Sequence, residues 1–436
     1  SMNNSNRVGP EGYASTPLSY NITSARLYSN VILSRKKYNI DIKALLAVIE
    51  GIESIHSPGI EYTIKLADTF NLLEQLKISG GEKIEITLEQ RLPNKTHKHS
   101  ITCYIGEIIN YKRSGTARAT YTLKCYSEHM INESVSVLRK SFKGTPGQLI
   151  QKICRGDLAV ATHFIQEGGG LLQGIYPQLR PLHAIFWIMR NTFDDGTPFF
   201  FYESLANGIQ FRSYKNMLGR VIQDRYYYKP FKEHSTESAE GFEEDRTHIK
   251  DISSPEYGMA KMVSTANGAF ASTLHKVDIS NKEYKKIVFN RERQKLNMLN
   301  RYKPYVQNNQ SMILNRGYSD HALSKQFFIN SNSKAFSTNN YYSDTDIDLN
   351  KGIAHIENLN FQTQEITIAG NFDLEVGSII DMTVYRSKGN TDGAGIDKAQ
   401  SGKYIVTQIV HTFDDNYSQR CVIQKDSGEL NYETSR

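Results

Sequence analysis

The stretch Ile366-Thr-Ile-Ala-Gly-Asn-Phe-Asp-Leu-Glu-Val-Gly-Ser-Ile-Ile-Asp-Met-Thr-Val384 decides the fold class of this chain. Apolar residues alternate with polar ones around Ile366 and Ile368, and again from Ile380 to Val384, which is the period-two pattern of half-buried strands. Gly370-Asn371 and Gly377 stand between the two runs, and both residue types tolerate positive φ. The stretch therefore predicts two short strands joined by a turn.

Two more strands are predicted after this stretch. Residues 401–413 alternate through Tyr404, Ile405 and Ile409 to His411, and residues 419–424 form a last apolar run. Asp414-Asp415-Asn416 lies between them and is typical of a polar turn. Residues 346–436 thus read as a β-rich segment that completes a barrel or sandwich.

Residues 18–127 predict a first β-barrel of the same kind. Its four alternating runs are Tyr62/Ile64/Leu66, Ile84/Ile86/Leu88, Ile101/Cys103/Ile105 and Tyr121/Leu123/Cys125. The regular spacing of short strands and turn signals is typical of all-β domains. Residues 68–76 predict a short helix between the first two runs.

The hydrophobic period changes to that of helices in residues 128–235. Thr145-Pro146 is a helix start, with a capping hydroxyl before a proline at the first helical position. Pro181 opens a second helix, and Asn207-Gly208 predicts a hairpin turn between residues 199–203 and 209–212. We expect a small α+β module here.

Two other parts of the chain are less regular. Residues 236–345 predict a connecting region that is partly second barrel, with a helix over Tyr284–Leu299 and a long exposed connection over residues 308–343. Residues 1–17 are polar and predict a flexible arm without a signal-peptide core. The fold class is therefore mainly β with α+β insertions, organised as two β-barrels plus smaller α+β modules.

Composition excludes several classes of protein. The net charge of +6 comes from 52 basic and 46 acidic residues. Because the basic groups are short and interspersed, no nucleic-acid binding is predicted. No apolar run approaches the ~20 residues of a membrane span. The four cysteines (Cys103, Cys125, Cys154 and Cys421) are scattered, so neither a disulfide framework nor a zinc site is predicted.

The histidines and aspartates give weak signals for metal binding. His97-Lys-His99 places two imidazoles on one face of a strand, but no third ligand is identifiable, which favours a polar loop. Asp344-Thr-Asp346-Ile-Asp348 resembles the start of an EF-hand loop. Leu349 stands where that loop needs glycine and His355 where it needs glutamate, so a solvated turn is the better interpretation. We predict no metal site and no cofactor.

Motifs for catalysis are weak as well. Gly168-Gly-Gly170 lacks the context of a phosphate loop and reads as a flexible linker. The acid pairs Asp194-Asp195, Glu243-Glu244 and Asp414-Asp415 are adjacent, whereas glycosidases need two carboxyls on opposite sides of the substrate. No catalytic residues are predicted, and the chain is predicted not to be an enzyme. His411 fits either a pH-sensitive group or a hydrogen-bonded packing histidine, and packing is favoured.

The order of these elements resembles a known family. The strand ending in Gly370-Asn-Phe372, the Leu374-x-x-Gly377 turn and the Gly402-x-Tyr404 strand running into Ile409-x-His411 resemble the baseplate hub, or tail hub, subunit of contractile-tailed bacteriophages of the T-even type. The segments Leu46–Asp68, Gly81–Ile86, Ser100–Ile108, Tyr121–Ser127, Thr145–Ile153 and Phe199–Phe211 are similar to that family in the same order. Residues 236–345 align with nothing in the family.

This resemblance implies a structural, non-enzymatic subunit. Hub subunits form homotrimers in which each chain supplies two tail-tube-like barrels, so that a threefold ring matches the sixfold tube above it. The implied partners are the central spike protein, the tail tube protein, the baseplate wedge proteins and the tape-measure protein. The implied location is the tail baseplate of the virion, assembled in the host cytoplasm.

Two other functions stay open at this point. A tail-associated module that binds glycans also fits a β-rich chain with 26 tyrosines. A peptidoglycan hydrolase is the third hypothesis, and it requires a catalytic carboxylate that the sequence does not single out.

Overall fold

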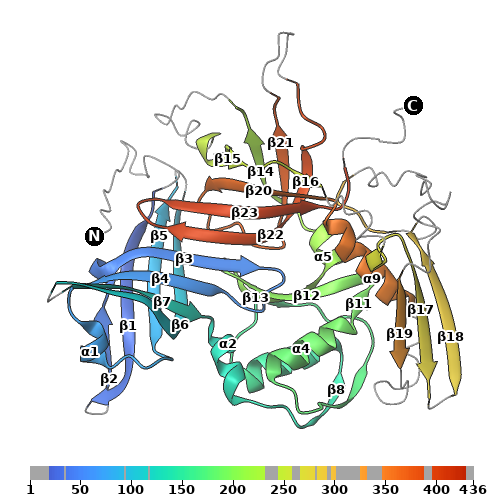
Figure 1. The fold of residues 1–436 in the computed structure, drawn as a ribbon, viewed down its shortest axis with the longest axis horizontal. Helices are drawn as coiled ribbons and strands as arrows, with labels where there is room; N and C mark the ends of the chain where they lie inside the picture. Colours follow the sequence, from blue (N-terminus) through green and yellow to red (C-terminus); the bar gives the residue numbers. More distant parts are fainter. Residues whose placement is uncertain are drawn as a thin grey trace.

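The computed structural model describes residues 19–33, 36–92, 95–115, 118–230, 244–257, 266–279, 282–291, 296–300, 325–330, 346–386 and 395–428. Two curved β-sheets, one α+β module and one small sheet make up this part of the chain (Figure 1). The predicted fold class, mainly β with two barrels and smaller α+β modules, is confirmed.

The first curved sheet surrounds its own hydrophobic core. Its strand order is β3-β4-β7-β6-β5-β1-β2, and every neighbouring pair is antiparallel. The four alternating runs predicted from the sequence lie on β4, β5, β6 and β7 and are buried. The strands are β1 (Asn21–Leu33), β2 (Lys36–Asp41), β3 (Leu46–Ser54), β4 (Glu61–Asp68), β5 (Lys83–Arg91), β6 (Thr96–Ser114) and β7 (Arg118–Tyr126). The predicted short helix is α1 (Leu72–Leu76), between β4 and β5. A 3-10 turn, η1 (Lys43–Leu45), precedes β3.

The second curved sheet is built mainly from the C-terminal strands. β22 pairs with β21 and β23, β23 pairs with β20, and β14 lies parallel to β21. Two short strands, β15 and β16, pair with the outer edge of β20. The strands are β14 (Ile222–Tyr228), β15 (Asp251–Ile252), β16 (Glu256–Tyr257), β20 (Gln362–Ala369), β21 (Ile379–Val384), β22 (Gly402–Phe413) and β23 (Tyr417–Lys425).

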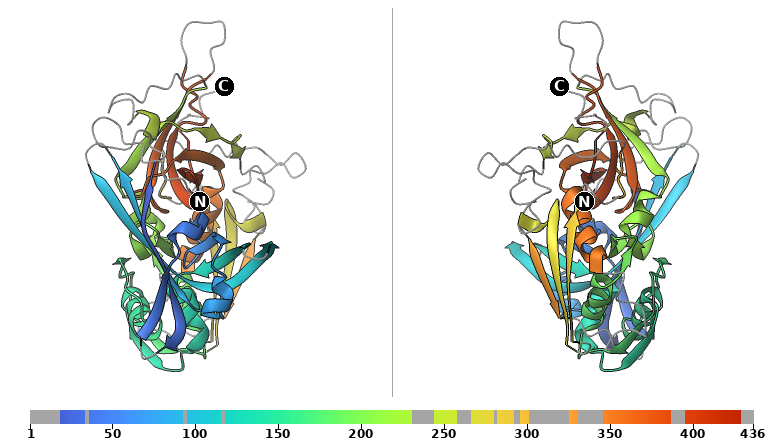
Figure 2. Two further views of the ribbon diagram at one scale, coloured as in Figure 1. Left: turned by 90° about the vertical axis from the view of Figure 1, so that its left-hand side faces the viewer. Right: turned by 90° about the vertical axis from the view of Figure 1, so that its right-hand side faces the viewer.

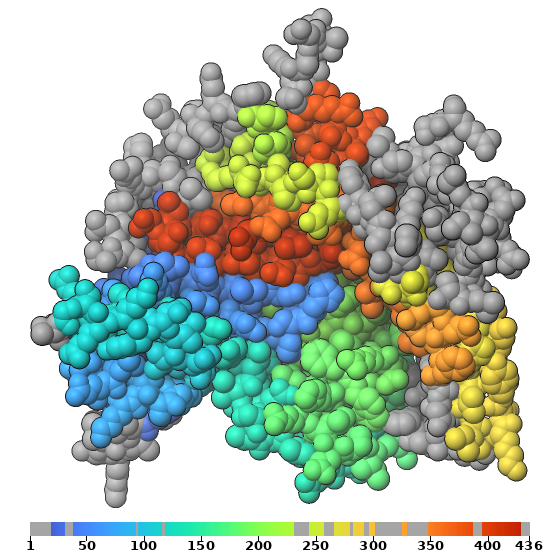
Figure 3. Space-filling view, in the orientation of Figure 1, coloured from blue at the N-terminus to red at the C-terminus, as the bar shows by residue number. Residues whose placement is uncertain are grey.

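The two curved sheets are joined edge to edge. β3 pairs with β4 on one side and with β22 on the other, so that Gly51 lies opposite His411. Backbone hydrogen bonds thus run without a break from the first sheet into the second, forming one 14-stranded sheet. Figure 1 shows β3 directly beside β22, and Figure 3 shows the same two segments in contact on the surface.

The α+β module lies below the paired strands β3 and β22 in the view of Figure 1. Thr145 caps α3 through a capping box with Gln148, as its position before Pro146 predicts. Pro181 begins α4, and Gly208, at φ +89°, closes the predicted hairpin of β12 and β13. The helices are α2 (Glu128–Asn132), α3 (Pro146–Lys152), α4 (Pro181–Arg190) and α5 (Tyr214–Leu218), with a 3-10 turn, η2 (Glu133–Val135), and a π-helical turn, η3 (Ile153–Asp157). The strands are β8 (Ser141–Gly144), β9 (Phe164–Ile165), β10 (Leu172–Ile175), β11 (Phe193–Asp194), β12 (Thr197–Ser204) and β13 (Gly208–Ser213).

Two predictions for the middle of the chain are wrong. The helix predicted over Tyr284–Leu299 is instead β18 (Glu283–Asn290), which pairs along its length with β17 (Ala271–Asp278). β19 (Gln326–Asn330) adds in parallel to β17. The solvated turn predicted around Asp346 and Asp348 is instead the start of α9 (Asp346–Leu359). Acidic residues are stabilised at this end of a helix by the positive end of the helix dipole.

Several predictions concern residues outside the described ranges. The arm over residues 1–17 falls entirely outside them, and so does most of the connection over residues 308–343. The helices that the structure describes include none that is both long and apolar enough to cross a membrane.

The predicted positive φ at Gly377 is confirmed, and it gives a first test of the fold. Gly377 has φ +78°, and a Cβ atom there would lie 2.6 Å from the Tyr202 hydroxyl oxygen. We expect Gly377→Val to lower the free energy of unfolding by at least about 2 kcal/mol, because backbone strain and overpacking add. Urea denaturation measures this loss.

Gly156→Ala is the matched control for Gly377→Val, since a Cβ at Gly156 meets no atom within 4 Å. An unchanged urea midpoint for Gly377→Val would contradict the assigned backbone conformation.

Candidate functional site

The loop that links β20 to β21, residues 370–378, is where the parts of the molecule meet. Its apolar side chains divide between two cores: Phe372 belongs to the core of the first sheet, whereas Leu374 and Val376 belong to that of the second. A single loop therefore packs against both curved sheets. We call this region the joint.

The beginning of the loop binds the first sheet and the last strand. The Gly370 carbonyl accepts a hydrogen bond from Gln90 Nε2 on β5 at 3.0 Å. Asn371 exchanges two hydrogen bonds with the side chain of Gln419 on β23, at 3.1 and 2.8 Å. Lys95 reaches Asp373 Oδ2 at 2.9 Å. These bonds fix the loop across the boundary between the two sheets.

Aromatic rings fill the space beneath the beginning of the loop. His99, Phe372, Tyr417 and Phe413 stack in series, with ring centroids 5.4, 4.9 and 4.2 Å apart. Gly370 makes room for this stack, because a Cβ at that position would lie only 1.9 Å from Tyr417 Cδ1. Glycine is thus needed at residue 370 for close packing, whereas at residue 377 it is needed for positive φ.

The Glu53 carboxylate lies at the centre of the joint. It projects from β3 with none of its surface exposed, and it accepts backbone hydrogen bonds from Leu205, in the turn between β12 and β13, and from Val376 in the loop. The bond to Leu205 N measures 2.5 Å and the bond to Val376 N 3.0 Å. One carboxylate therefore connects the first sheet, the α+β module and the loop of the second sheet.

His411 lies against Glu53 on the neighbouring strand β22. Its Nε2 is 3.4 Å from Glu53 Oε2, a close contact rather than a hydrogen bond, since this nitrogen makes no hydrogen bond. Its Nδ1 lies 3.0 Å from the Tyr417 hydroxyl. The prediction of a hydrogen-bonded packing histidine is confirmed.

A second buried carboxylate, Glu375, fixes the other end of the loop. It accepts hydrogen bonds from Ser204, Asn207 and Gln210 of the β12–β13 hairpin at 2.6–2.9 Å, and Arg220 Nη2 lies 2.5 Å away. Burial raises the pKa of Glu375, but these hydrogen bonds and the Arg220 charge outweigh burial and leave the pKa lowered. The carboxylate is thus held in its charged form.

Sequence reasoning missed Glu53, Glu375 and Arg220. A signal for Glu53 was present: alternation along β3 puts Ile49, Gly51 and Glu53 on one face, and that face is buried. A charged residue in phase with apolar ones indicates a buried, hydrogen-bonded group. Glu375 carried no such signal, because its partners lie more than 150 residues away in the sequence.

The histidines and acids weighed for chemistry have structural partners. The polar loop predicted for His97 and His99 is wrong, because both residues lie on β6 and pair with β5. His97 Nδ1 lies 3.5 Å from Asp373 Oδ1, and His99 stacks on Phe372. Asp195 and Gly196 both have positive φ in the two-residue turn between β11 and β12, and Asp414 accepts a hydrogen bond from Asn416 N. Both turn predictions are confirmed. In the described ranges no three His, Cys, Asp or Glu residues gather as a metal site would require.

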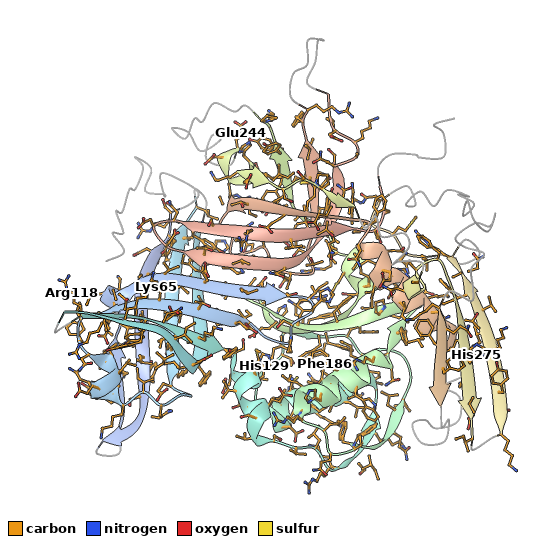
Figure 4. All side chains as sticks on the ribbon, in the orientation of Figure 1. Lys65, Arg118, His129, Phe186, Glu244 and His275 are labelled. Atoms are coloured by element: carbon orange, nitrogen blue, oxygen red, sulfur yellow. The ribbon has the colours of Figure 1, made fainter. Side chains whose placement is uncertain are left out.

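Ser127, His129 and Glu203 bring together the residue types of a hydrolase triad near the joint, but in the wrong arrangement. The Ser127 hydroxyl donates directly to Glu203 Oε2, whereas a triad places histidine between serine and acid. His129 Nε2 instead faces the Pro58 carbonyl at 2.7 Å and lies 4.0 Å from Glu203 (Figure 4 labels His129). In this geometry His129 cannot take the Ser127 proton.

Comparisons with known proteins identify the fold. No family model matches the chain, and no curated protein matches it at a significant level. Among solved structures, the tail protein from Neisseria meningitidis MC58 aligns with a TM-score of 0.53 at 12% identity, over 93% of this chain and 96% of that one. The chain has the fold of a tail protein.

A second solved structure agrees over a similar length. The 43 kDa tail protein of prophage MuSo2 from Shewanella oneidensis aligns with a TM-score of 0.51 at 9% identity, over 94% of this chain and 100% of that protein. At such low identity the likeness establishes the fold and leaves the function to be argued from the molecule.

Removing the Glu53 carboxylate should destabilise the whole molecule. We expect Glu53→Leu to lower the free energy of unfolding by about 3–5 kcal/mol, because two buried N–H groups and His411 lose their partner. The measurement is urea denaturation followed by circular dichroism. Glu61→Leu, at an exposed position on β4, is the control and should change stability by no more than about 0.5 kcal/mol. A Glu53→Leu protein as stable as the control would show that the joint does not depend on this carboxylate.

The joint also predicts a pH dependence of stability. Burial, together with the nearby His411, lowers the pKa of His99 to about 4, whereas a histidine in the unfolded chain has its ordinary pKa of 6.5. Between these two values only the unfolded chain binds the proton, so stability should fall as pH falls from 6.5 to 4, by about 3 kcal/mol from this residue.

His99→Phe keeps the ring stack and removes the titration, so its unfolding free energy should vary less over this pH range than that of the wild type. His183→Gln, at a side chain that is 68% exposed, is the control and should follow the wild-type curve. Parallel curves for His99→Phe and the wild type would refute the prediction.

Proposed function

We propose that this chain is a structural subunit of a phage tail, and more specifically a baseplate hub subunit. The observation that carries the proposal is the tail-protein fold, which extends over more than nine tenths of this chain and of both tail proteins compared with it. The resemblance of residues 360–425 to hub subunits supports the finer assignment.

The architecture fits a symmetry adaptor. In the proposed ring, residues 18–127 form one tube-like barrel, and residues 346–436 with part of 236–345 form the other. Residues 128–235 form the α+β module, except for β14 (Ile222–Tyr228), which adds to the second barrel. Three chains then present six barrels to a sixfold tube while keeping threefold symmetry towards a spike.

The joint supplies the rigidity that this role requires. A ring closes only if the angle between the two barrels of each subunit is fixed. Continuous backbone pairing between β3 and β22 and the buried Glu53 and Glu375 carboxylates restrict that angle. A flexible linker between two independent barrels would leave that angle free to vary.

The proposed partners follow from this role. They are further copies of the chain in a homotrimer, the central spike protein, the tail tube protein, the baseplate wedge proteins and the tape-measure protein. The proposed location is the tail baseplate of the virion after assembly in the host cytoplasm, and the proposed role is non-enzymatic.

The mass of the purified chain in solution tests the ring. We expect light scattering to give three times the chain mass of 49.6 kDa. Adding the spike protein of the same phage should not change the number of chains per ring. A chain that stays monomeric both alone and with its spike would contradict the hub assignment and favour the glycan-binding alternative.

A further inference from the structure

The small sheet β18-β17-β19 has one covered face and one open face. Ser272, Leu274 and Phe289 lie on the covered face, where Asn350 of α9 donates a hydrogen bond to the Ser272 hydroxyl at 2.7 Å. Figure 2 shows α9 beside these three strands. On this face the sheet packs against α9, and the exposed apolar side chains of the described strands lie on the opposite face.

The open face collects exposed apolar side chains. Of the 16 large hydrophobic side chains exposed in the described residues, five belong to this sheet or its β17–β18 turn. Single exposed apolar residues are normal on a protein surface, but a contiguous group marks an interaction site. The five are Val277 (42% exposed), Ile279 (68%), Tyr284 (62%), Val288 (53%) and Phe328 (75%).

Three rings on the open face form a fixed stack across the sheet. His275 lies between Tyr284 and Phe328, with ring centroids 6.0 and 4.7 Å away (Figure 4 labels His275). Its two ring nitrogens contact the Tyr284 hydroxyl at 2.6 Å and Gln326 Oε1 at 3.1 Å. Since the rings are already held in place, a partner would order them at little entropic cost.

The stack also indicates the form of the partner. Rings 4.7 Å apart with an interplanar angle of 9° face one another, so they do not lie flat on the sheet as a platform for a sugar. Ring edges and aliphatic side chains form the surface, which suits the side chains of a protein segment.

Charge on β18 defines the partner further. Tyr284, Lys286 and Val288 occupy alternate positions of β18, so they share the open face. Each is about 7 Å from the next along the strand. Lys286 is exposed between two apolar side chains. The complementary ligand is an extended segment with a carboxylate at its centre and an apolar side chain two residues to either side.

We propose that the open face of the β18-β17-β19 sheet binds an extended acidic segment of another protein, with a carboxylate of that segment against Lys286 and apolar side chains against Tyr284 and Val288. In the proposed tail assembly, which this inference takes as its setting, the face is a docking surface at the end of the subunit opposite to β1 and β2 (Figure 1). It leaves the joint untouched.

A designed peptide tests the docking surface directly. The probe is a fluorescein-labelled peptide with valine, glutamate and phenylalanine at alternate positions and serine between them, and the control peptide has lysine in place of glutamate. We expect fluorescence anisotropy to show saturable binding of the glutamate peptide, about tenfold tighter than that of the lysine peptide.

Substitutions on the face identify the contact. Lys286→Glu should reverse the preference between the two peptides, and Tyr284→Ser should weaken binding of the glutamate peptide about tenfold. Lys65→Glu, at an exposed lysine on β4, is the matched control and should bind as the wild type does. Circular dichroism confirms that each variant is folded.

Two kinds of result would overturn the proposal. The first is an absence of saturable binding, or a preference that Lys286→Glu leaves unchanged. The second is a change in the solution mass of the Lys286→Glu protein by whole chains, which would mean that a second copy occupies the face. The mass of the wild-type protein tests the ring separately, so failure of the docking surface and failure of the hub assignment are distinguishable.

Discussion

The burial of the Glu53 carboxylate is the constraint on which the rest of the structure depends. A charged group without solvent must be surrounded by hydrogen-bond donors, and its donors here come from two other parts of the chain, at Leu205 and Val376. The carboxylate can be satisfied only when β3, the β12–β13 hairpin and the loop of residues 370–378 are all in place. Folding of each part is thus tied to the position of the others.

The loop itself shows how one segment serves two cores. Phe372 packs into the first core, and Leu374 and Val376 into the second, while Asp373 and Glu375 pair with Lys95 and Arg220 on either side. An alternating segment of this kind would normally be a strand with one buried face. Here the alternating residues pack into two different cores, so the pattern reflects contacts with two neighbouring modules rather than a strand.

The proposed ring role and the proposed docking surface place different demands on the molecule. A ring subunit needs a stiff centre, and the joint provides it through buried charge and continuous strand pairing. A docking surface needs exposure and a fixed pattern of apolar and charged groups, which the β18-β17-β19 sheet provides at one end. The two are separated in space, so a partner can bind the end of the subunit without disturbing the angle between the curved sheets.

The local elements of the fold can be read from short runs of residues. Period-two runs predicted β4 to β7 in the first curved sheet and β20 to β23 in the second, whereas β1, β2 and β14 were not predicted. Thr145-Pro146 and Pro181 predicted the starts of α3 and α4, and the glycine at residue 377 indicated a positive φ. These signals are readable because each depends on residues close together in the chain. The helix predicted over Tyr284–Leu299 was wrong because the pairing of β18 with β17, a contact that local sequence does not show, overrides local propensity.

The joint, the small sheet and its open face depend on contacts between residues that are distant in the chain. The partners of Glu53 are 152 and 323 residues away, and the close approach of Gly370 to Tyr417 exists only after β20 and β23 have paired. The pairing of β3 with β22, which turns two barrels into one continuous sheet, likewise joins the two ends of the chain. The physical reason is that hydrogen bonding and packing act between neighbours in space, while a single sequence shows only neighbours along the chain.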